Sequence, residues 1–233
     1  MAPRDRSVAD TAPGPERTTL NELLVRALPG AQPTTIDVLT ASARIRHARA
    51  GERIYRQGDP VPLTLLMSGY GAFRRTTENG QLLVSGIAAA GLLVGYSAMA
   101  SSLSSVEFIA LTECDVAQWQ GSEIRALAGA DPGLAFAAID SMAASLHLAM
   151  ERIEGFLHQD ARRRVIRILA RHRDLFFGDP AILTRSHLPS LVGTSREMTA
   201  RVLRELEREG TLTRVGRSGL TLLRPDRLES GAA

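Results

Sequence analysis

The spacing of apolar and polar positions divides the chain into a strand-rich front part and a helical back part. From about 44 to 119, short apolar runs are separated by turn signals such as Gly-Asp, Ser-Gly and Ala-Gly. The dipeptide Asn79-Gly80 lies between the runs 72–77 and 81–87, which predicts a hairpin. Short strands at regular spacing with turns between them predict a closed or double-sheet β domain.

A long uncharged run, 79–106, lies inside this front part. Its length alone would allow a membrane span. However, Gly86, Gly91 and Gly95 interrupt the run at turn-like intervals, and no arginine follows it until Arg125. One flank therefore lacks a basic anchor, and buried β structure is the favoured interpretation.

The first residues of the chain differ in composition from the strand-rich part. Residues 1–19 are rich in Pro, Thr, Ala and Arg and predict a disordered tail. An amphipathic helix is expected to open at Thr18 and to end at Pro29-Gly30.

From 131 to 158 the apolar positions follow a helical period. Their spacing alternates between four and three residues along a seam of Ala135, Ile139, Met142, Leu146, Ala149, Ile153 and Phe156. Such a heptad seam fits a two-stranded coiled coil and predicts a homodimer. The alternative is one face of a helix that packs on its own domain.

Charge is distributed unevenly, although the whole chain carries only +3. All 28 basic residues are Arg, which a GC-rich genome would also produce. From Asp160 to the end there are 15 Arg against 9 acidic residues, a net of +6, so the front part carries about −3. A basic back part indicates contact with a polyanion.

Cys114 is the one cysteine of the chain. A single cysteine excludes a disulfide framework, a four-cysteine zinc site and an iron–sulfur cluster that one chain's cysteines hold alone. Because Cys114 lies in an alternating strand pattern, a small buried residue is expected there rather than a redox sensor.

The segment Leu183–Leu223 predicts a helix-turn-helix followed by a wing. A short helix over 186–192 is followed by a turn at Gly193, and Ser195 is placed to cap a second helix. The second helix has the buried stripe Val202, Leu203 and Leu206 and leaves near or on its free face Arg196, Glu197, Thr199, Arg201 and Arg204. Two short strands around 216–219 form the expected wing. A solvent-exposed helix with i,i+4 ion pairs among Glu197, Arg201 and Glu205 would explain the charges. It would not explain why a helix, a glycine turn, a capped helix and a wing follow one another.

With these residues the chain resembles the cyclic-AMP receptor protein/fumarate-nitrate regulator (CRP/FNR) family of bacterial transcription factors over about Leu20–Leu228. The resemblance rests on 192–197 with Arg201, Leu203, Leu206, Glu207 and Gly210, and in the front part on 50–59, Leu66, Gly69, Arg74, Gly80, Gly91 and Gly95. It implies a cytoplasmic homodimer without membrane contact, bound to double-stranded DNA with a two-fold symmetric TGTGA-like site. RNA polymerase is a further implied partner.

The resemblance also assigns roles to residues of the helix-turn-helix. Base reading falls to Arg196, Glu197 and Arg201, and phosphate contacts fall to Thr184, Arg185, Thr194 and Ser195. Arg suits guanine O6 and N7 in the major groove, and Glu can accept a hydrogen bond from cytosine N4. The implied fold is α+β. A tail (1–19) precedes an N-terminal double-stranded, jelly-roll-like β-roll effector domain (20–130), and a dimerisation helix (131–158) and a winged helix-turn-helix (159–233) follow it.

The uncharged run departs from the family members that bind cyclic nucleotides. Tyr96 stands where those members have a ribose-binding Glu, and Ser104-Ser105 replaces the Arg-Ser pair that holds the cyclic phosphate. A buried phosphate needs a charged, forked partner, so control by cyclic AMP is not expected. The run is expected to form two strands and a short helix around an empty or rebuilt pocket. The residues assigned to this pocket are Gly95, Tyr96, Ser104, Ser105, His147 and Met150.

The effector stays open at this point. The cysteine count argues against an iron–sulfur cluster, whereas haem is left open because five His and several Met residues are available. The alternatives are a regulator that senses haem, a gas or another small effector, and a constitutive regulator set by its own level. A sensor subunit of an enzyme is a further rival, but no kinase or cyclase motif is present, so the chain is not expected to be an enzyme.

Overall fold

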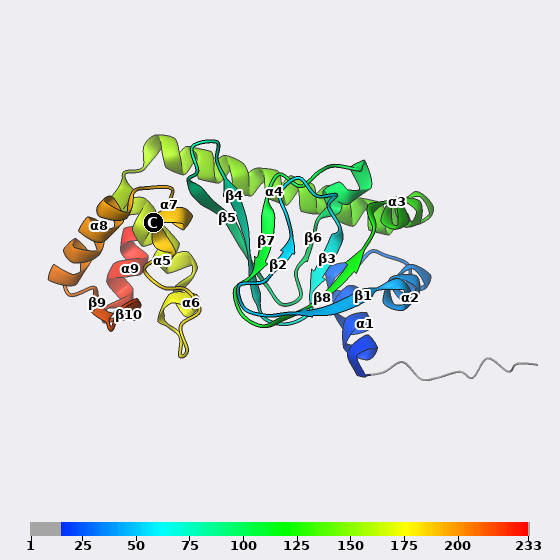
Figure 1. Cartoon of the computed structure of the whole chain (residues 1–233), viewed down its shortest axis with the longest axis horizontal. Coiled ribbons are helices and arrows are strands. Elements are labelled where there is room, and N and C mark those ends of the chain that lie inside the picture. The colour runs from blue at the N-terminus through cyan, green and yellow to red at the C-terminus, as the bar shows by residue number, and fades with distance from the viewer. Residues whose placement is uncertain (1–14, 233) are drawn as a thin grey trace, which may run out of the picture.

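The structure is a computed structural model that describes residues 15–232 (Figure 1). Most of the predicted disordered tail, 1–14, lies outside the described residues. The first helix, α1 (Pro15–Ala27), begins three residues earlier than predicted, so 15–19 are helical rather than part of a tail. A second helix, α2 (Pro33–Ser42), follows in a segment for which no element was predicted.

The strand-rich part forms two four-stranded antiparallel sheets, as predicted. One sheet has the order β1-β8-β3-β6 and the other β2-β7-β4-β5. Their bounds are β1 (Arg44–Ala48), β2 (Arg53–Tyr55), β3 (Leu63–Leu66), β4 (Tyr70–Thr76), β5 (Leu82–Ala89), β6 (Leu93–Val94), β7 (Glu107–Ala110) and β8 (Cys114–Trp119). The predicted hairpin at Asn79-Gly80 is confirmed, because β4 pairs with β5 across it.

The uncharged run folds as expected into strands and a short helix rather than into one continuous span. It contains β5, β6 and the 3-10 helix η1 (Tyr96–Ala100). Gly95 has a φ of 87° before η1, and a Cβ there would lie 2.2 Å from the carbonyl oxygen of Pro62. The glycine is therefore required by the turn and by close packing against the neighbouring loop.

Aromatic side chains fill the space between the two sheets. Phe73 stacks on Phe108 with ring centroids 4.6 Å apart, and Tyr55 lies 5.7 Å from Phe108 in a tilted arrangement. Phe108, on β7, is fully buried and lies in one cluster with Leu66 and Val116 of the facing sheet. The buried Cys114 belongs to the same cluster, as its strand pattern predicted, and burial raises the pKa of its thiol.

A second apolar cluster fastens helices to the roll. It joins α1 and α2 to Leu63, Leu65 and Trp119, and the Trp119 indole Nε1 donates to the carbonyl of Leu39 at 2.9 Å. Helix α3 (Gly121–Ala130) contributes Ile124 to this cluster. The N-terminal helices thereby complete the core of the roll.

Helix α4 (Pro132–His158) is the long helix that the apolar spacing predicts over 131–158, with Asp131 as its cap. The Asp131 carboxylate caps it by accepting from the Gly133 amide at 2.8 Å. At 1.5 Å per residue its 27 residues span about 40 Å, and Figure 1 shows it running along the roll from α3 to the C-terminal domain. Leu134, Ala138 and Gly155 are its buried residues.

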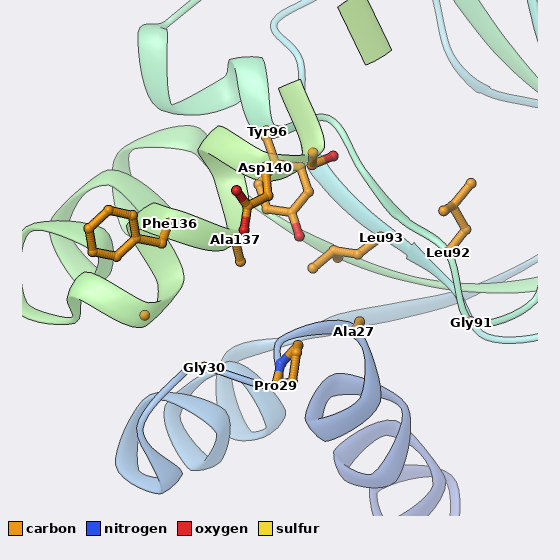
Figure 2. Close-up of a pocket in the computed structure, with 12 residues that line it drawn as sticks. Ala27, Pro29, Gly30, Gly91, Leu92, Leu93, Tyr96, Phe136, Ala137 and Asp140 are labelled. Carbon is orange, nitrogen blue, oxygen red and sulfur yellow. The ribbon is translucent and has the colours of Figure 1, made fainter. Parts of the chain in front are cut away.

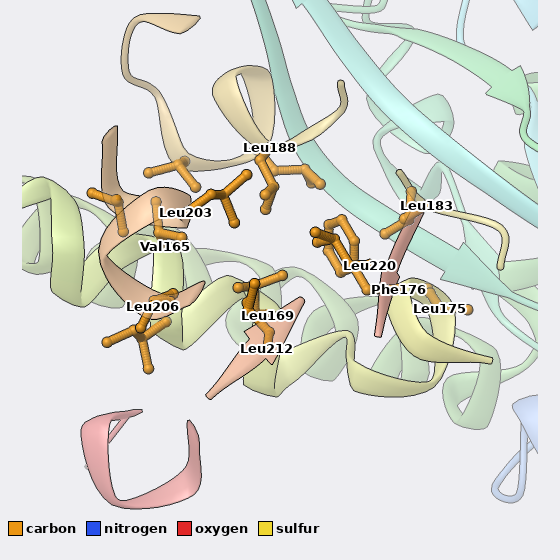
Figure 3. Close-up of a cluster of buried hydrophobic side chains, with 14 of the residues drawn as sticks. Val165, Leu169, Leu175, Phe176, Leu183, Leu188, Leu203, Leu206, Leu212 and Leu220 are labelled. Carbon is orange, nitrogen blue, oxygen red and sulfur yellow. The ribbon is translucent and has the colours of Figure 1, made fainter. Parts of the chain in front are cut away.

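The C-terminal domain is a winged helix-turn-helix around one apolar core (Figure 3). Its elements are α5 (Ala161–Arg171), α6 (Arg173–Phe177), α7 (Leu188–Val192), α8 (Arg196–Arg208), β9 (Leu212–Val215), β10 (Gly219–Leu222) and α9 (Pro225–Ala232). Asp160 caps α5 as predicted, accepting from the Arg163 amide at 2.7 Å. Fully buried Val165, Leu169 and Phe176 occupy the centre of this core.

The same core continues onto the β-roll. Ala72, Val84 and Ile109, from β4, β5 and β7, belong to one cluster with Leu191 and the other buried residues of the C-terminal domain. These three strand residues alternate with the inward-facing Phe73 and Phe108, so they lie on the outer face of the sheet. The two domains therefore share an apolar contact, with α7 against β5.

Candidate nucleic-acid interface

The helix-turn-helix is built from α7, a left-handed residue and α8. Gly193 follows α7 with a φ of 68°, a conformation that glycine adopts at little cost. Ser195 then caps α8, because its hydroxyl oxygen accepts from the Met198 amide at 3.1 Å. Both features were predicted from the sequence.

Helix α8 has one buried side and one exposed side. The buried residues are Val202, Leu203 and Leu206, as predicted, together with Thr199. The placement of Thr199 near the free face was wrong: it is 2% exposed, and its hydroxyl donates to the carbonyl of Ser195 at 3.0 Å. A threonine can bury its hydroxyl in this way because the helix supplies an acceptor one turn back.

The exposed side of α8 carries the charges. Arg196, Glu197 and Arg204 are exposed and form no ion pair with any residue that the structure describes. Nε of Arg201 lies 3.2 Å from Oε1 of Glu205, so one of the alternative's i,i+4 ion pairs is present. Figure 1 shows α8 on the side of the C-terminal domain that faces away from the roll. Its N-terminal half is therefore open to a large partner.

Of the residues expected at phosphates, Thr184 and Arg185 precede α7, whereas Thr194 and Ser195 lie in the turn before α8. Besides the capping residue Ser195, Thr184 and Arg185 also form hydrogen bonds within the chain. The Arg185 amide donates to Ser218 at 3.1 Å, and its guanidinium donates to the carbonyl of Arg217. The Thr184 hydroxyl lies 2.7 Å from that of Ser186. Arg185 thus ties the wing to the segment that precedes α7, a role that no pattern in the sequence indicated.

The wing is held to the recognition helix by charge. Strands β9 and β10 pair around 216–218, as predicted. Arg214 on β9 forms an ion pair with Glu207 on α8 at 2.7 Å, and this contact holds the pKa of the Glu207 carboxyl below its usual value. The wing and α8 therefore present a common surface.

The residues assigned to an effector pocket are not brought together by the structure. A cavity of about 580 Å³ lies between the loop 27–30, the β5–β6 turn and α4, and of the six assigned residues Tyr96 alone lines it (Figure 2). Burial raises the pKa of the Tyr96 hydroxyl to about 12. Asp140 and Phe136 of α4 complete this cavity, and no pattern in the sequence pointed to them.

The remaining assigned residues lie elsewhere. The His147 side chain is 80% exposed and lies 3.6 Å from Glu151 on the same helix, and Met150 is also exposed. Ser105 is exposed, while the buried Ser104 donates its hydroxyl to the Val106 carbonyl at 2.6 Å. His147 and Met150 consequently do not face the roll within their own chain.

Two sequence models of protein domains match the chain in the order that the fold shows. The cyclic nucleotide-binding domain matches residues 45–131, and the Crp-like helix-turn-helix domain matches residues 151–230. The chain belongs to the CRP/FNR family. It is accordingly a CRP/FNR-type transcription regulator with a helix-turn-helix DNA-binding domain, in a family of regulators rather than enzymes.

Solved CRP/FNR structures show the same fold at low identity. The c-di-GMP-responsive global regulator CLP of Xanthomonas campestris is 24% identical, with a TM-score of 0.70 over 82% of this chain and 99% of that chain. FixK2 of Bradyrhizobium japonicum is 21% identical, with a TM-score of 0.69 over 82% and 98%. The CRP/FNR regulator TTHA1359 of Thermus thermophilus is 22% identical, with a TM-score of 0.69 over 81% and 98%. A comparison with curated proteins found no match.

Helix α4 is long and apolar enough to cross a membrane. It is the one helix with these properties among the described residues 15–232. In this family the long apolar helix is the dimerisation helix. Its hydropathy is therefore no evidence for a membrane.

Two histidines make the C-terminal domain sensitive to acid. Burial, with the charges of Arg171 and Arg152, lowers the pKa of His172 to about 4 from 6.5. Burial also lowers the pKa of His187, whose Nδ1 accepts from the Thr184 amide at 2.9 Å. Both rings are therefore neutral in the folded protein, and protonation of His187 at Nδ1 would break that bond.

We predict that the free energy of unfolding falls as the pH is lowered from about 7 to about 5, because the unfolded chain binds protons that the folded chain excludes. The loss should be on the order of 1 kcal/mol, because partial solvent screening reduces the effect of the pKa shifts. Urea unfolding at both pH values measures it. The double variant His172→Gln/His187→Gln should lose most of the dependence; an unchanged slope would contradict the assignment.

Proposed function

We propose that the protein is a cytoplasmic homodimer that reads a two-fold symmetric TGTGA-like site on double-stranded DNA and is not controlled by cyclic AMP. The observation that carries the proposal is the open N-terminal face of α8, where Arg196 and Glu197 are exposed on a helix fixed by its Ser195 cap. A recognition helix puts this end into the major groove. RNA polymerase is proposed as a further partner on the family's precedent.

Base reading follows from the side-chain types on that face. A guanidinium at 196 can donate two parallel hydrogen bonds to guanine, and the Glu197 carboxylate can accept from cytosine N4. The Arg201 side chain is 68% exposed, so it can leave Glu205 for a base at small cost. Thr184 and Arg185 before α7 and Thr194 and Ser195 before α8 are proposed to contact phosphates, which would fix the register of the helix.

The first test of this assignment is Arg196→Ala. Loss of a bidentate guanine contact should cost about 1–3 kcal/mol at one base position and relax the preference there. Site selection from a random DNA library at fixed salt measures the change. Arg208→Ala, in the last turn of the same helix, removes an equal charge and should leave the preference intact. An unchanged base preference in Arg196→Ala would contradict the assignment of α8 as the helix that reads bases.

Dimerisation is supported by the exposed seam of α4. Ile139, Met142, Leu146 and Ile153 are each about half exposed or more in the single chain, and Ala149 between them is also exposed. A continuous apolar stripe of this kind marks an interaction surface. A second copy of α4 would cover it with the heptad geometry that the spacing predicts.

The seam is tested by the double variant Leu146→Asp/Ile153→Asp. Four carboxylates would face one another across the two-fold axis, so the dimer should be lost. Sedimentation velocity measures the association state, and cooperative binding to paired half-sites should disappear with it. Ala144→Asp, an exposed position on the opposite side of α4, serves as the control. If the double variant stayed dimeric, the dimer interface would lie outside the α4 seam.

Independence from cyclic AMP is supported by the filling of the roll. Phe73 and Phe108 stack between the sheets, and Ser104 gives its hydroxyl to the chain's own backbone. Arg74, which could otherwise take over a phosphate, forms an ion pair with Glu107 at 2.7 Å. A buried phosphate without a cationic partner would be strongly disfavoured.

Calorimetric titration with cyclic AMP and cyclic GMP tests this part. We expect no tight binding, and a change of less than about twofold in DNA affinity, because a ligand shifts a state only by its differential affinity. Tight binding with a clear gain in DNA affinity would show that another residue holds the phosphate.

A different effector is the second candidate, favoured by the cavity beside Tyr96. Its volume of about 580 Å³ lies in the range of ligand sites, and most of its lining is apolar. The cavity is lined by no histidine among the described residues, so it offers no imidazole ligand for haem. Absorption spectroscopy and extraction of the purified protein would distinguish haem, another bound effector and a constitutive regulator.

A further inference from the structure

The last turn of α4 meets the turn of the helix-turn-helix in the same chain. A Cβ atom at Gly193 would lie 2.7 Å from Cε1 and 2.9 Å from Cζ of the Phe156 ring. Real side chains do not approach so closely, so the ring occupies space that the glycine leaves open. Gly193 is thus required twice, by its φ of 68° and by this ring.

The Phe156 ring is also held from the side of the domain junction. The guanidinium carbon of Arg164, on α5, lies 5.4 Å from the ring centroid, within the range of a cation–π contact. A nitrogen of that guanidinium, Nη1, donates to the carbonyl of Gln159 at 2.7 Å. Arg164 therefore braces the link between α4 and α5 while it covers the ring.

The β4–β5 hairpin reaches the same point. Leu83 Cδ1 would lie 3.9 Å from a Cβ at Gly193, and Val84 belongs to the core of the C-terminal domain. Arg152, one turn before Phe156, donates from its guanidinium to the Ser85 carbonyl on β5. The end of α4, the hairpin and the turn between α7 and α8 thus converge around one aromatic ring.

We infer that Phe156 is a positioning residue that sets the orientation of the recognition helix relative to α4. Two recognition helices must lie about 34–36 Å apart to enter successive major grooves. In a dimer joined along α4, that separation depends on how each helix-turn-helix is seated on its own α4. This step rests on the proposed homodimer.

This role differs from the place of Phe156 in the seam. Phe156 is the last seam position and is 40% exposed, yet its ring lies against Gly193 and Arg164 of its own chain. If it serves docking, its removal should leave the dimer intact and loosen the DNA-binding domain. If it serves the seam, its removal should weaken the dimer.

The experiment measures half-site spacing preference. Sites are first selected from a random library with the wild-type protein, and the two half-sites are then moved apart or together in single base-pair steps. Wild type should prefer one spacing strongly. Phe156→Ala should reduce the ratio of the affinity at the preferred spacing to the affinity at other spacings by about tenfold. The base preference within a half-site should stay unchanged. Phe156→Leu, which keeps an apolar side chain, should fall between them. Arg196→Ala is the matched control, since it should alter base preference and keep the spacing preference.

A double-mutant cycle tests the contact itself. Gly193→Ala should flatten the spacing preference in the wild-type background, because its methyl group strikes the ring. In the Phe156→Ala background the same substitution should have a much smaller effect, since the backbone strain at Gly193 is present in both backgrounds and cancels. Equal effects in the two backgrounds would mean that the ring and the turn are not coupled.

Amide hydrogen exchange across 191–195 gives a readout that needs no DNA. Phe156→Ala should exchange about tenfold faster there while sedimentation still shows a dimer. An unchanged spacing preference, unchanged exchange or dissociation to monomers would each overturn the inference. If the wild type selected no DNA, the proposed function would fail, and exchange and sedimentation would still decide the role of Phe156.

Discussion

A long apolar helix that its own chain covers only in part is the constraint on which the rest of this structure depends. Helix α4 is apolar enough to cross a membrane, yet Leu134, Ala138 and Gly155 are its buried positions. Its first turns are anchored in the core of the roll, and its last turn lies against the C-terminal domain. Because exposed apolar stripes are costly in water, the middle of α4 requires a cover. That requirement connects the fold to the proposed homodimer, and the homodimer to the proposed two-fold DNA site.

Most of the fold was predictable because its signals are local. The heptad spacing identified α4, Asn79-Gly80 identified the β4–β5 hairpin, and Gly193 with Ser195 identified the helix-turn-helix. Periodicity reports which side of an element is buried, but not which element covers it. Thr199 was misplaced because a polar type does not show that an acceptor, the Ser195 carbonyl, lies one turn back. For the same reason periodicity did not show that Phe156, the last seam position, also lies against the distant Gly193.

The candidate site was less predictable, because several charges act within the chain. The basic surplus after residue 159 suggested a polyanion, but four of these 15 arginines form ion pairs with carboxylates: Arg162 with Glu209, Arg173 with Glu229, Arg201 with Glu205 and Arg214 with Glu207. Arg185 is turned to the wing. Sequence position likewise did not show on which side of α4 the assigned His147 and Met150 lie: both are exposed and do not line the cavity beside Tyr96.

The aromatic stack of Tyr55, Phe73 and Phe108 also bears on the lifetime of the protein in a cell. A receptor with an unfilled binding site gains folding free energy when its metabolite is abundant, so its turnover follows metabolism. In this roll the chain's own rings pack together between the sheets. If the roll binds no cyclic nucleotide, as proposed, the fraction of unfolded chains that proteases encounter does not depend on the concentration of such a ligand.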